Sequence, residues 1–129
     1  QVTHGVETGE GDQALFSIPF NVTARNGDIY IPRITGVEYS LSGAVELTVE
    51  ESTMVSSGII DSEFFLIEEG ATEGIKVFVH ATAIGGTADF VSMRLESLTW
   101  MSVTDKQPRS QTKNIRGLAT ESVFVAPGL

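Results

Sequence analysis

The sequence predicts an all-β protein, built as one antiparallel β-sandwich of seven to eight strands. Several short segments alternate apolar and polar residues with a period of two, the pattern of a strand that has one face on a core and one in water. Residues that favour turns separate these segments, and no stretch of ten residues carries the apolar spacing of a helix. Regular short strands with turns between them are typical of a sandwich.

The clearest strand is predicted at residues 16–24, where every second residue is apolar. These residues are Phe16, Ile18, Phe20, Val22 and Ala24. Asn26 and Gly27 then favour a turn, because both tolerate a left-handed backbone. A second extended run follows at residues 29–32 and is limited by Pro32.

The next two strands are predicted as a hairpin. Alternating residues at 37–41 and 45–49 flank a turn at Ser42 and Gly43. Residues 51–62 are rich in serine and predict a loop with a short edge segment whose apolar side chains fold back on the core. Those side chains are Met54, Val55, Ile59 and Ile60.

The second half of the chain repeats the strand pattern. A brief apolar run at residues 64–67 leads through an acidic turn to strict alternation at residues 75–83. Apolar residues change parity within residues 88–100, which predicts a β-bulge near Glu96 and Ser97. The polar residues 105–114 predict a long exposed loop, and a last strand is expected at residues 118–125.

We expect one continuous core from the inward positions of these strands. The positions are Phe16, Ile18, Phe20, Val22, Val45, Leu47, Val49, Val77, Val79, Met93 and Leu95.

Length and composition indicate a single domain. A chain of 129 residues can bury a sufficient core without disulfides, and cysteine is absent. The polar residues 1–13 predict a flexible lead-in or linker, and residues 14–129 the sandwich domain. A net charge of −9 argues against binding to nucleic acid or to an anionic bilayer. No apolar run approaches the roughly 18–20 residues that a membrane span needs, so we expect no direct membrane insertion.

The order of the strand segments resembles a known family. The segments FNVTA, GDIYIP, GVEYSLSG, FFLIEEG, VSMRLESLTW and ATESVFV follow one another between residues 14 and 125. This order is similar to immunoglobulin-like modules near the ends of large surface proteins of uncultured bacteria of the Patescibacteria (Parcubacteria) type. The resemblance implies an immunoglobulin-like sandwich in an extracellular or cell-surface position, and a structural role in a larger chain or an assembly. It implies no catalytic residues.

The sequence shows no set of catalytic residues, so we expect a protein that is not an enzyme. His4 lies in the lead-in, and His80 has the opposite parity to Val79 and Ala81, which places it on the outer face of its strand. A catalytic set of His80, Asp89 and Ser92 would require convergence across a Gly-Gly turn.

Calcium and carbohydrate remain alternative ligands, and no other cofactor is expected. Glu68, Glu69 and Glu73 are weak calcium candidates around one turn, together with Asp28 and Asp61 if the loops cluster. The spacing matches no EF-hand loop, and a solvated acidic turn is the simpler interpretation. Tyr30 and Trp100 could form an aromatic platform for a sugar, although packing in the core is favoured.

The distribution of charge gives the most informative functional signal. Residues 105–117 carry a net charge of +3, and the rest of the chain carries −12. The basic residues are Lys106, Arg109, Lys113 and Arg116. A solvated loop would explain them, and so would a positive patch that meets the acidic surface of a neighbour. We therefore expect a structural or adhesive module whose partners are neighbouring domains or like subunits, with a carbohydrate- or calcium-binding module as the alternative.

Overall fold

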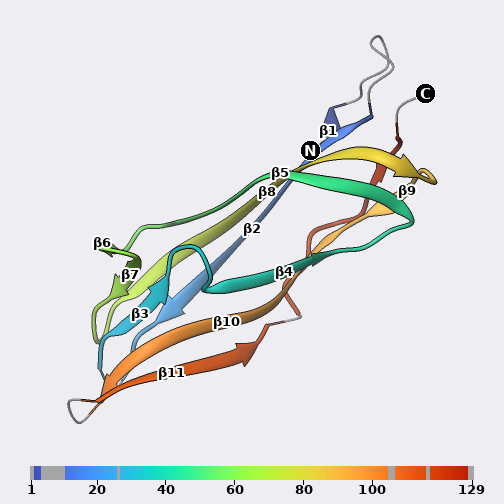
Figure 1. Ribbon diagram of the computed structural model, residues 1–129. Helices are drawn as coiled ribbons and strands as arrows, with labels where there is room; N and C mark the ends of the chain where they lie inside the picture. The colour runs from blue at the N-terminus through green and yellow to red at the C-terminus, as the bar shows by residue number, and fades with distance from the viewer. Residues whose placement is uncertain (1, 4–10, 26, 105–106, 116, 128–129) are drawn as a thin grey trace.

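The computed structural model describes residues 2–3, 11–25, 27–104, 107–115 and 117–127. These residues form β-strands and turns, and the strands pair antiparallel throughout. Two larger sheets pack on each other in an elongated, β-sandwich-like body (Figure 1). The all-β, antiparallel fold predicted from the sequence is confirmed. Among the described residues there is no helix with the length and apolar character that membrane crossing requires.

The first sheet is organised around a long central strand. Its order is β1 (Val2–Thr3), β2 (Gln13–Thr23), β8 (Thr72–Gly86) and β5 (Val45–Ser56). Along β2, Phe16 and Ile18 are buried whereas Ser17 and Pro19 are exposed, as the alternation predicted. Strand β8 pairs along nearly its whole length with both neighbours, β2 and β5, so it is the central strand of this sheet.

The second sheet has the order β11 (Gln107–Asn114), β10 (Met93–Thr104), β3 (Ile29–Pro32), β7 (Phe64–Ile67) and β6 (Ile59–Asp61), and β4 (Val37–Leu41) pairs with β10 beside β3. The register of β10 against β4 shifts between Leu95 and Ser97, so the predicted β-bulge is confirmed. A separate two-stranded ribbon is formed by β9 (Asp89–Val91) and β12 (Val123–Val125).

The core consists of two clusters rather than the single one expected. The larger cluster joins β2 and β8 to β10 and includes Phe16, Val79 and Leu95. The smaller cluster lies around Ile31 and Ile67. The side chains that pack against both clusters are Phe20, Val37, Met54 and Ile115. These four side chains connect the two clusters.

Val49 is not a core residue, in contrast to the prediction. It pairs with Ala81, which is fully buried, so Val49 lies on the core side of the sheet as its parity required. Nevertheless its side chain is 40% exposed. Val49 lies in the terminal strand of the first sheet, within the exposed run of residues 48–53.

The predicted hairpin across Ser42 and Gly43 is wrong. β4 pairs with β10 in the second sheet, whereas β5 pairs with β8 in the first. The connection at residues 42–44 therefore carries the chain from one sheet to the other. Local alternation and a turn signal are the same for a hairpin and for a crossover, so only the packing distinguishes them.

The predicted loop at residues 105–114 is also wrong for its described part. Residues 107–114 form strand β11, which pairs with β10 from Thr104↔Gln107 to Ser97↔Asn114. A polar terminal strand needs no apolar face, so the alternation that marks other strands is missing.

The remaining boundaries differ in detail. Strand β5 continues to Ser56, into the predicted loop. Of the four side chains expected to fold back on the core, Met54 does so, whereas Val55, Ile59 and Ile60 are exposed. The last strand, β12, covers only Val123–Val125 of the predicted residues 118–125. Asp12 is buried and its N–H donates to the carbonyl of Ala126 at 2.9 Å, so the fold begins before residue 14. Twelve strands are present in the described residues, because several are short, and the expected seven to eight are not confirmed.

Candidate functional site

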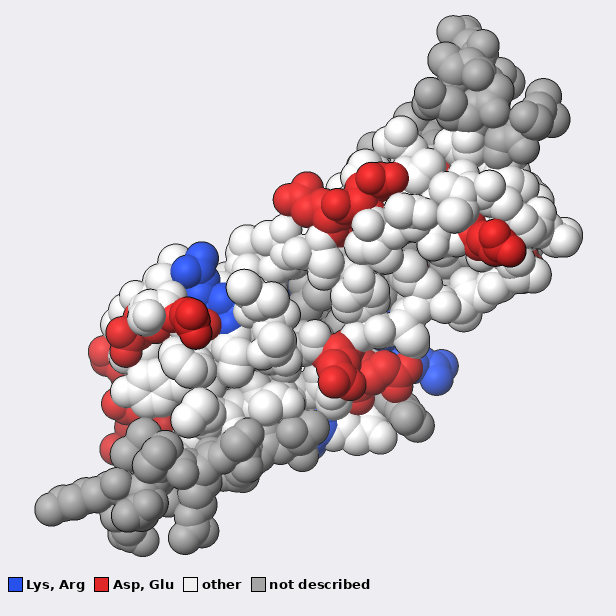
Figure 2. Space-filling model, in the orientation of Figure 1, with Lys and Arg blue, Asp and Glu red and all other residues white. Residues whose placement is uncertain are grey.

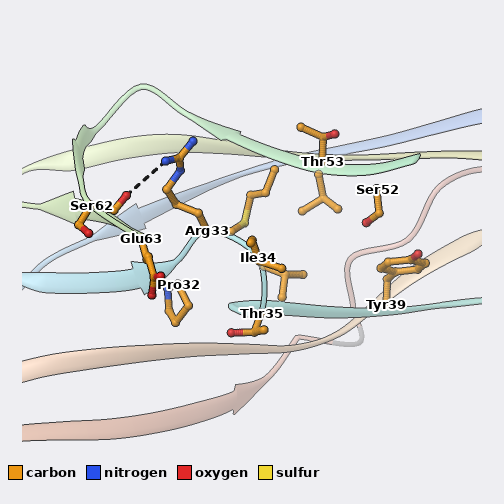
Figure 3. A pocket seen from close by; sticks show the side chains of 12 residues that line it. Pro32, Arg33, Ile34, Thr35, Tyr39, Ser52, Thr53, Ser62 and Glu63 are labelled. Carbon is orange, nitrogen blue, oxygen red and sulfur yellow. Dashed lines mark hydrogen bonds between the residues drawn. The ribbon is translucent and has the colours of Figure 1, made fainter. Parts of the chain in front are cut away.

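The sandwich is open along one side, between β4 of the second sheet and β5 of the first. A groove of about 640 Å³ lies there, and its apolar lining includes Val37, Tyr39, Met54 and Val77. Figure 3 shows the groove extending from Arg33, Ser62 and Glu63 at one end to Tyr39 and Ser52 at the other. Within the described chain, β4 pairs only with β10 and β5 pairs only with β8. The groove is therefore flanked by two strand edges that carry no partner strand.

The turn between β3 and β4 forms one wall of the groove. Gly36 donates its N–H to the carbonyl of Pro32 at 3.0 Å, and a Cβ at Gly36 would lie 2.5 Å from that carbonyl oxygen. Arg33 is held in place by two contacts: Nη1 donates to the carbonyl of Ser62 at 3.3 Å, and the guanidinium lies 5.7 Å from the centre of the Phe65 ring. Ile34, at the tip of the turn, is 93% exposed.

Strand β5 forms the opposite wall and has an unusual pattern of exposure. The six consecutive residues 48–53 are all exposed, although a strand in a sandwich normally buries every second side chain. The register against β8 shifts twice, between Glu46 and Leu47 and between Val49 and Glu51. Such bulges bend and twist an edge away from regular pairing. This part of β5 is accessible on both faces and along its free edge.

Strand β5 is also acidic. It carries Glu46, Glu50 and Glu51, all exposed, and no basic residue. Figure 2 shows acidic side chains on the surface that β5 occupies in Figure 1. A carboxylate oxygen of Glu51 accepts a hydrogen bond from the hydroxyl of Thr53 at 3.2 Å. The edge of β5 therefore presents negative charge, and no strand of the described chain pairs with its outer side.

The basic residues singled out in the sequence fall in or beside β11. Arg109 lies in register with Ser102, and Lys113 lies in register with Leu98 and is exposed. Lys106 and Arg116 lie outside the described residues. β11 ends the second sheet, so its outer edge has no partner strand among the described residues.

The calcium candidates are not brought together. Glu68 and Glu69 are exposed on the turn after β7, and the N–H of Glu69 donates to a carboxylate oxygen of Asp28 at 2.8 Å. Glu73 accepts a hydrogen bond from the hydroxyl of Ser57 at 2.7 Å, and Asp61 lies on β6. In the described ranges no three acidic or histidine side chains form a group that could hold a metal ion.

The catalytic set considered for His80 is not assembled. Nε2 of His80 lies 3.1 Å from Oε1 of Gln13, whereas Ser92 pairs with the hydroxyl of Ser42 at 3.0 Å. Asp89 accepts from the N–H groups of Ala44 and Phe90, each at 2.8 Å. These two hydrogen bonds favour the ionised carboxylate and hold the pKa of Asp89 below its usual value.

The aromatic platform considered for a sugar does not form either. Tyr30 pairs with Met101, the residue after Trp100, so the two rings lie on opposite faces of the sheet. Trp100 packs against the smaller core cluster, and Tyr30 makes an edge contact with Phe64, with ring centres 6.1 Å apart.

The sequence contained only part of this site. The charges of β5 and β11 are visible in the sequence, but the free edges and the groove depend on which strands pair. The local signal for the extension of β5 is a pair of β-branched residues at alternate positions, Thr53 and Val55. No protein-family model, curated protein or solved structure matches the chain.

Proposed function

We propose that the chain is a non-catalytic structural or adhesive module that joins like subunits or neighbouring domains in a bacterial cell-surface protein or filament. The observation that carries the proposal is the pair of long terminal strands, β5 and β11, which are opposite in charge and which, among the described residues, each have a partner strand on one side alone. Natural sheets shorten or cover edges that must stay monomeric, as β1 and β6 illustrate with two and three residues. The strands at the opposite ends of the two sheets, β5 with twelve residues and β11 with eight, are long for edges that have no partner strand in the described chain.

The immunoglobulin-like and cell-surface parts of the proposal rest on the resemblance of the ordered segments described above. A sandwich with strand connections that cross between sheets fits that class, and the connection from β4 to β5 is one such crossing. The dispersed carboxylates and the separated Tyr30 and Trp100 rings give no support to a calcium or sugar site.

Self-association of the full chain tests this function. We expect sedimentation velocity at low salt to show species larger than a monomer that grow with protein concentration. High salt should reduce them, because exposed charges are screened beyond about 8–10 Å at moderate ionic strength. A chain that stays monomeric at every concentration and at both salts would contradict assembly through like subunits.

A further inference from the structure

We infer that the acidic edge of β5 in one molecule pairs, strand against strand, with the basic edge of β11 in a second copy of the chain. This inference rests on the proposed function and names the contact through which subunits join. β5 ends the first sheet and β11 ends the second, so in the described chain each has one side without a partner strand. Edges of this kind offer N–H and C=O groups that an added strand can pair with.

The charges select this combination of edges. β5 carries three glutamates and no basic residue, whereas β11 carries Arg109 and Lys113 and no acidic residue. Two copies of β5 side by side would oppose glutamate to glutamate, and two copies of β11 would oppose cation to cation. Like charges across a strand pair are destabilising. Only the mixed pairing of β5 with β11 places opposite charges together. The charges therefore disfavour pairing of either edge with the same edge of another copy.

The position of the two strands makes the contact one that can repeat. Figure 1 shows β5 and β11 along opposite sides of the elongated body. Pairing between two different surfaces leaves the growing assembly with an unused β5 edge at one end and an unused β11 edge at the other. Such head-to-tail contacts extend into a filament unless the rotation closes a ring.

The backbone supplies most of the attraction in this contact. Exposed ion pairs are individually weak, so the charges steer and set the register while main-chain hydrogen bonds hold the strands. Pro108 in β11 has no N–H to donate, so the pairing is carried by the remaining residues of the strand. Because β5 is the terminal strand of its sheet in the described chain, an added strand can lie beside residues 48–53.

A charge exchange on the full chain tests the contact. In one variant Glu46, Glu50 and Glu51 are replaced by Lys, and in the other Arg109 and Lys113 are replaced by Glu. We expect each variant alone to sediment as a monomer at low salt, because its two edges now carry the same sign. An equimolar mixture should recover the large species, since each edge of one variant then matches an edge of the other.

A matched control changes three exposed glutamates outside β5. The variant with Glu68→Lys, Glu69→Lys and Glu121→Lys has the same net charge as the β5 variant and should associate like the wild type. The inference is overturned if the wild type associates but the two edge variants associate equally well, or if their mixture stays monomeric. If the two edge variants associate as the wild type does, assembly proceeds through another surface and the proposed function still stands. A wild type that never associates overturns the inference and, with it, the assembly of like subunits in the proposed function.

Hydrogen exchange of the unaltered protein provides a second measurement that does not depend on variants folding. Amides in residues 45–56 and 107–114 should exchange more slowly in the associated protein than in the dilute monomer. Unchanged exchange in both segments, in a sample that has associated, would overturn the inference.

Discussion

The carboxylate of Asp89 holds the chain where it crosses from one sheet to the other. One oxygen accepts the N–H of Ala44, in the connection between β4 and β5, and the other accepts the N–H of Phe90 in β9. Both bonds favour the charged form, the bond from Ala44 most, and they outweigh the opposing effect of desolvation. The pKa of Asp89 in the folded protein is therefore lower than its ordinary value of 3.8.

Replacing Asp89 by Asn should destabilise the protein in a pH-dependent way. Because the folded pKa is lowered, the stabilisation is complete above the unfolded value of 3.8 and is lost as the pH falls through the folded value. The urea midpoint of Asp89→Asn should lie below that of the wild type at pH 7. The gap should narrow as the pH falls below about 4. A gap that stays constant at acidic pH would contradict this role of the charge.

At the scale of elements, the connection between β4 and β5 decides the architecture. Three residues at 42–44 separate a strand of the second sheet from a strand of the first. Gly43 has a φ of +121°, a conformation that side chains with a Cβ rarely adopt. The crossing also passes close to β9, because a Cβ on Gly43 would lie 2.9 Å from the carbonyl oxygen of Phe90 and 3.0 Å from Cγ2 of Val91.

Gly43→Ala should therefore destabilise the fold by about 1–3 kcal/mol, the usual cost of a strained backbone conformation. Chemical denaturation followed by circular dichroism measures the loss. Gly117→Ala is the matched control, since its Cβ would meet nothing within 4 Å and its stability should stay near that of the wild type. Equal midpoints for the two variants would show that the crossing tolerates a side chain.

At the scale of the whole molecule, two core clusters must act as one unit. Phe20 is half-buried in β2 and packs against both clusters, and Trp100 packs against the smaller one. Burial of an aromatic ring contributes apolar contact to every neighbour it touches. The shared side chains therefore couple the unfolding of one cluster to that of the other.

Phe20→Ala should lower the stability of both clusters together, by about 3 kcal/mol, at the low end for a buried Phe because the ring is partly exposed. Tryptophan fluorescence follows the smaller cluster and far-ultraviolet circular dichroism follows all the strands. We expect the two transitions to coincide in the wild type and to shift together in the variant. Val49→Ala, at an exposed position, should change stability by only about 0.5 kcal/mol. Separate transitions in the wild type would show that the clusters unfold independently.

Much of the local structure follows from the sequence alone. Alternation at residues 16–24 and 75–83 determines both the strands and their inward faces, because successive side chains of a strand point to opposite sides wherever it pairs. The change of parity before Leu98 likewise determines the bulge. These features depend on neighbours in the chain and so can be predicted from it.

Tertiary structure decided the rest, because pairing and coverage depend on residues far apart in the chain. Val49 has the parity of a core residue, but its side chain is exposed in the terminal strand of the first sheet. Ser42 and Gly43 favour a turn in any context, and only the packing sends β4 and β5 into different sheets. β11 has no apolar face to reveal it, since its pairing comes from the backbone opposite β10. The candidate site has the same origin: the sequence supplied the charges of β5 and β11, and the order of the described strands placed both at the ends of sheets.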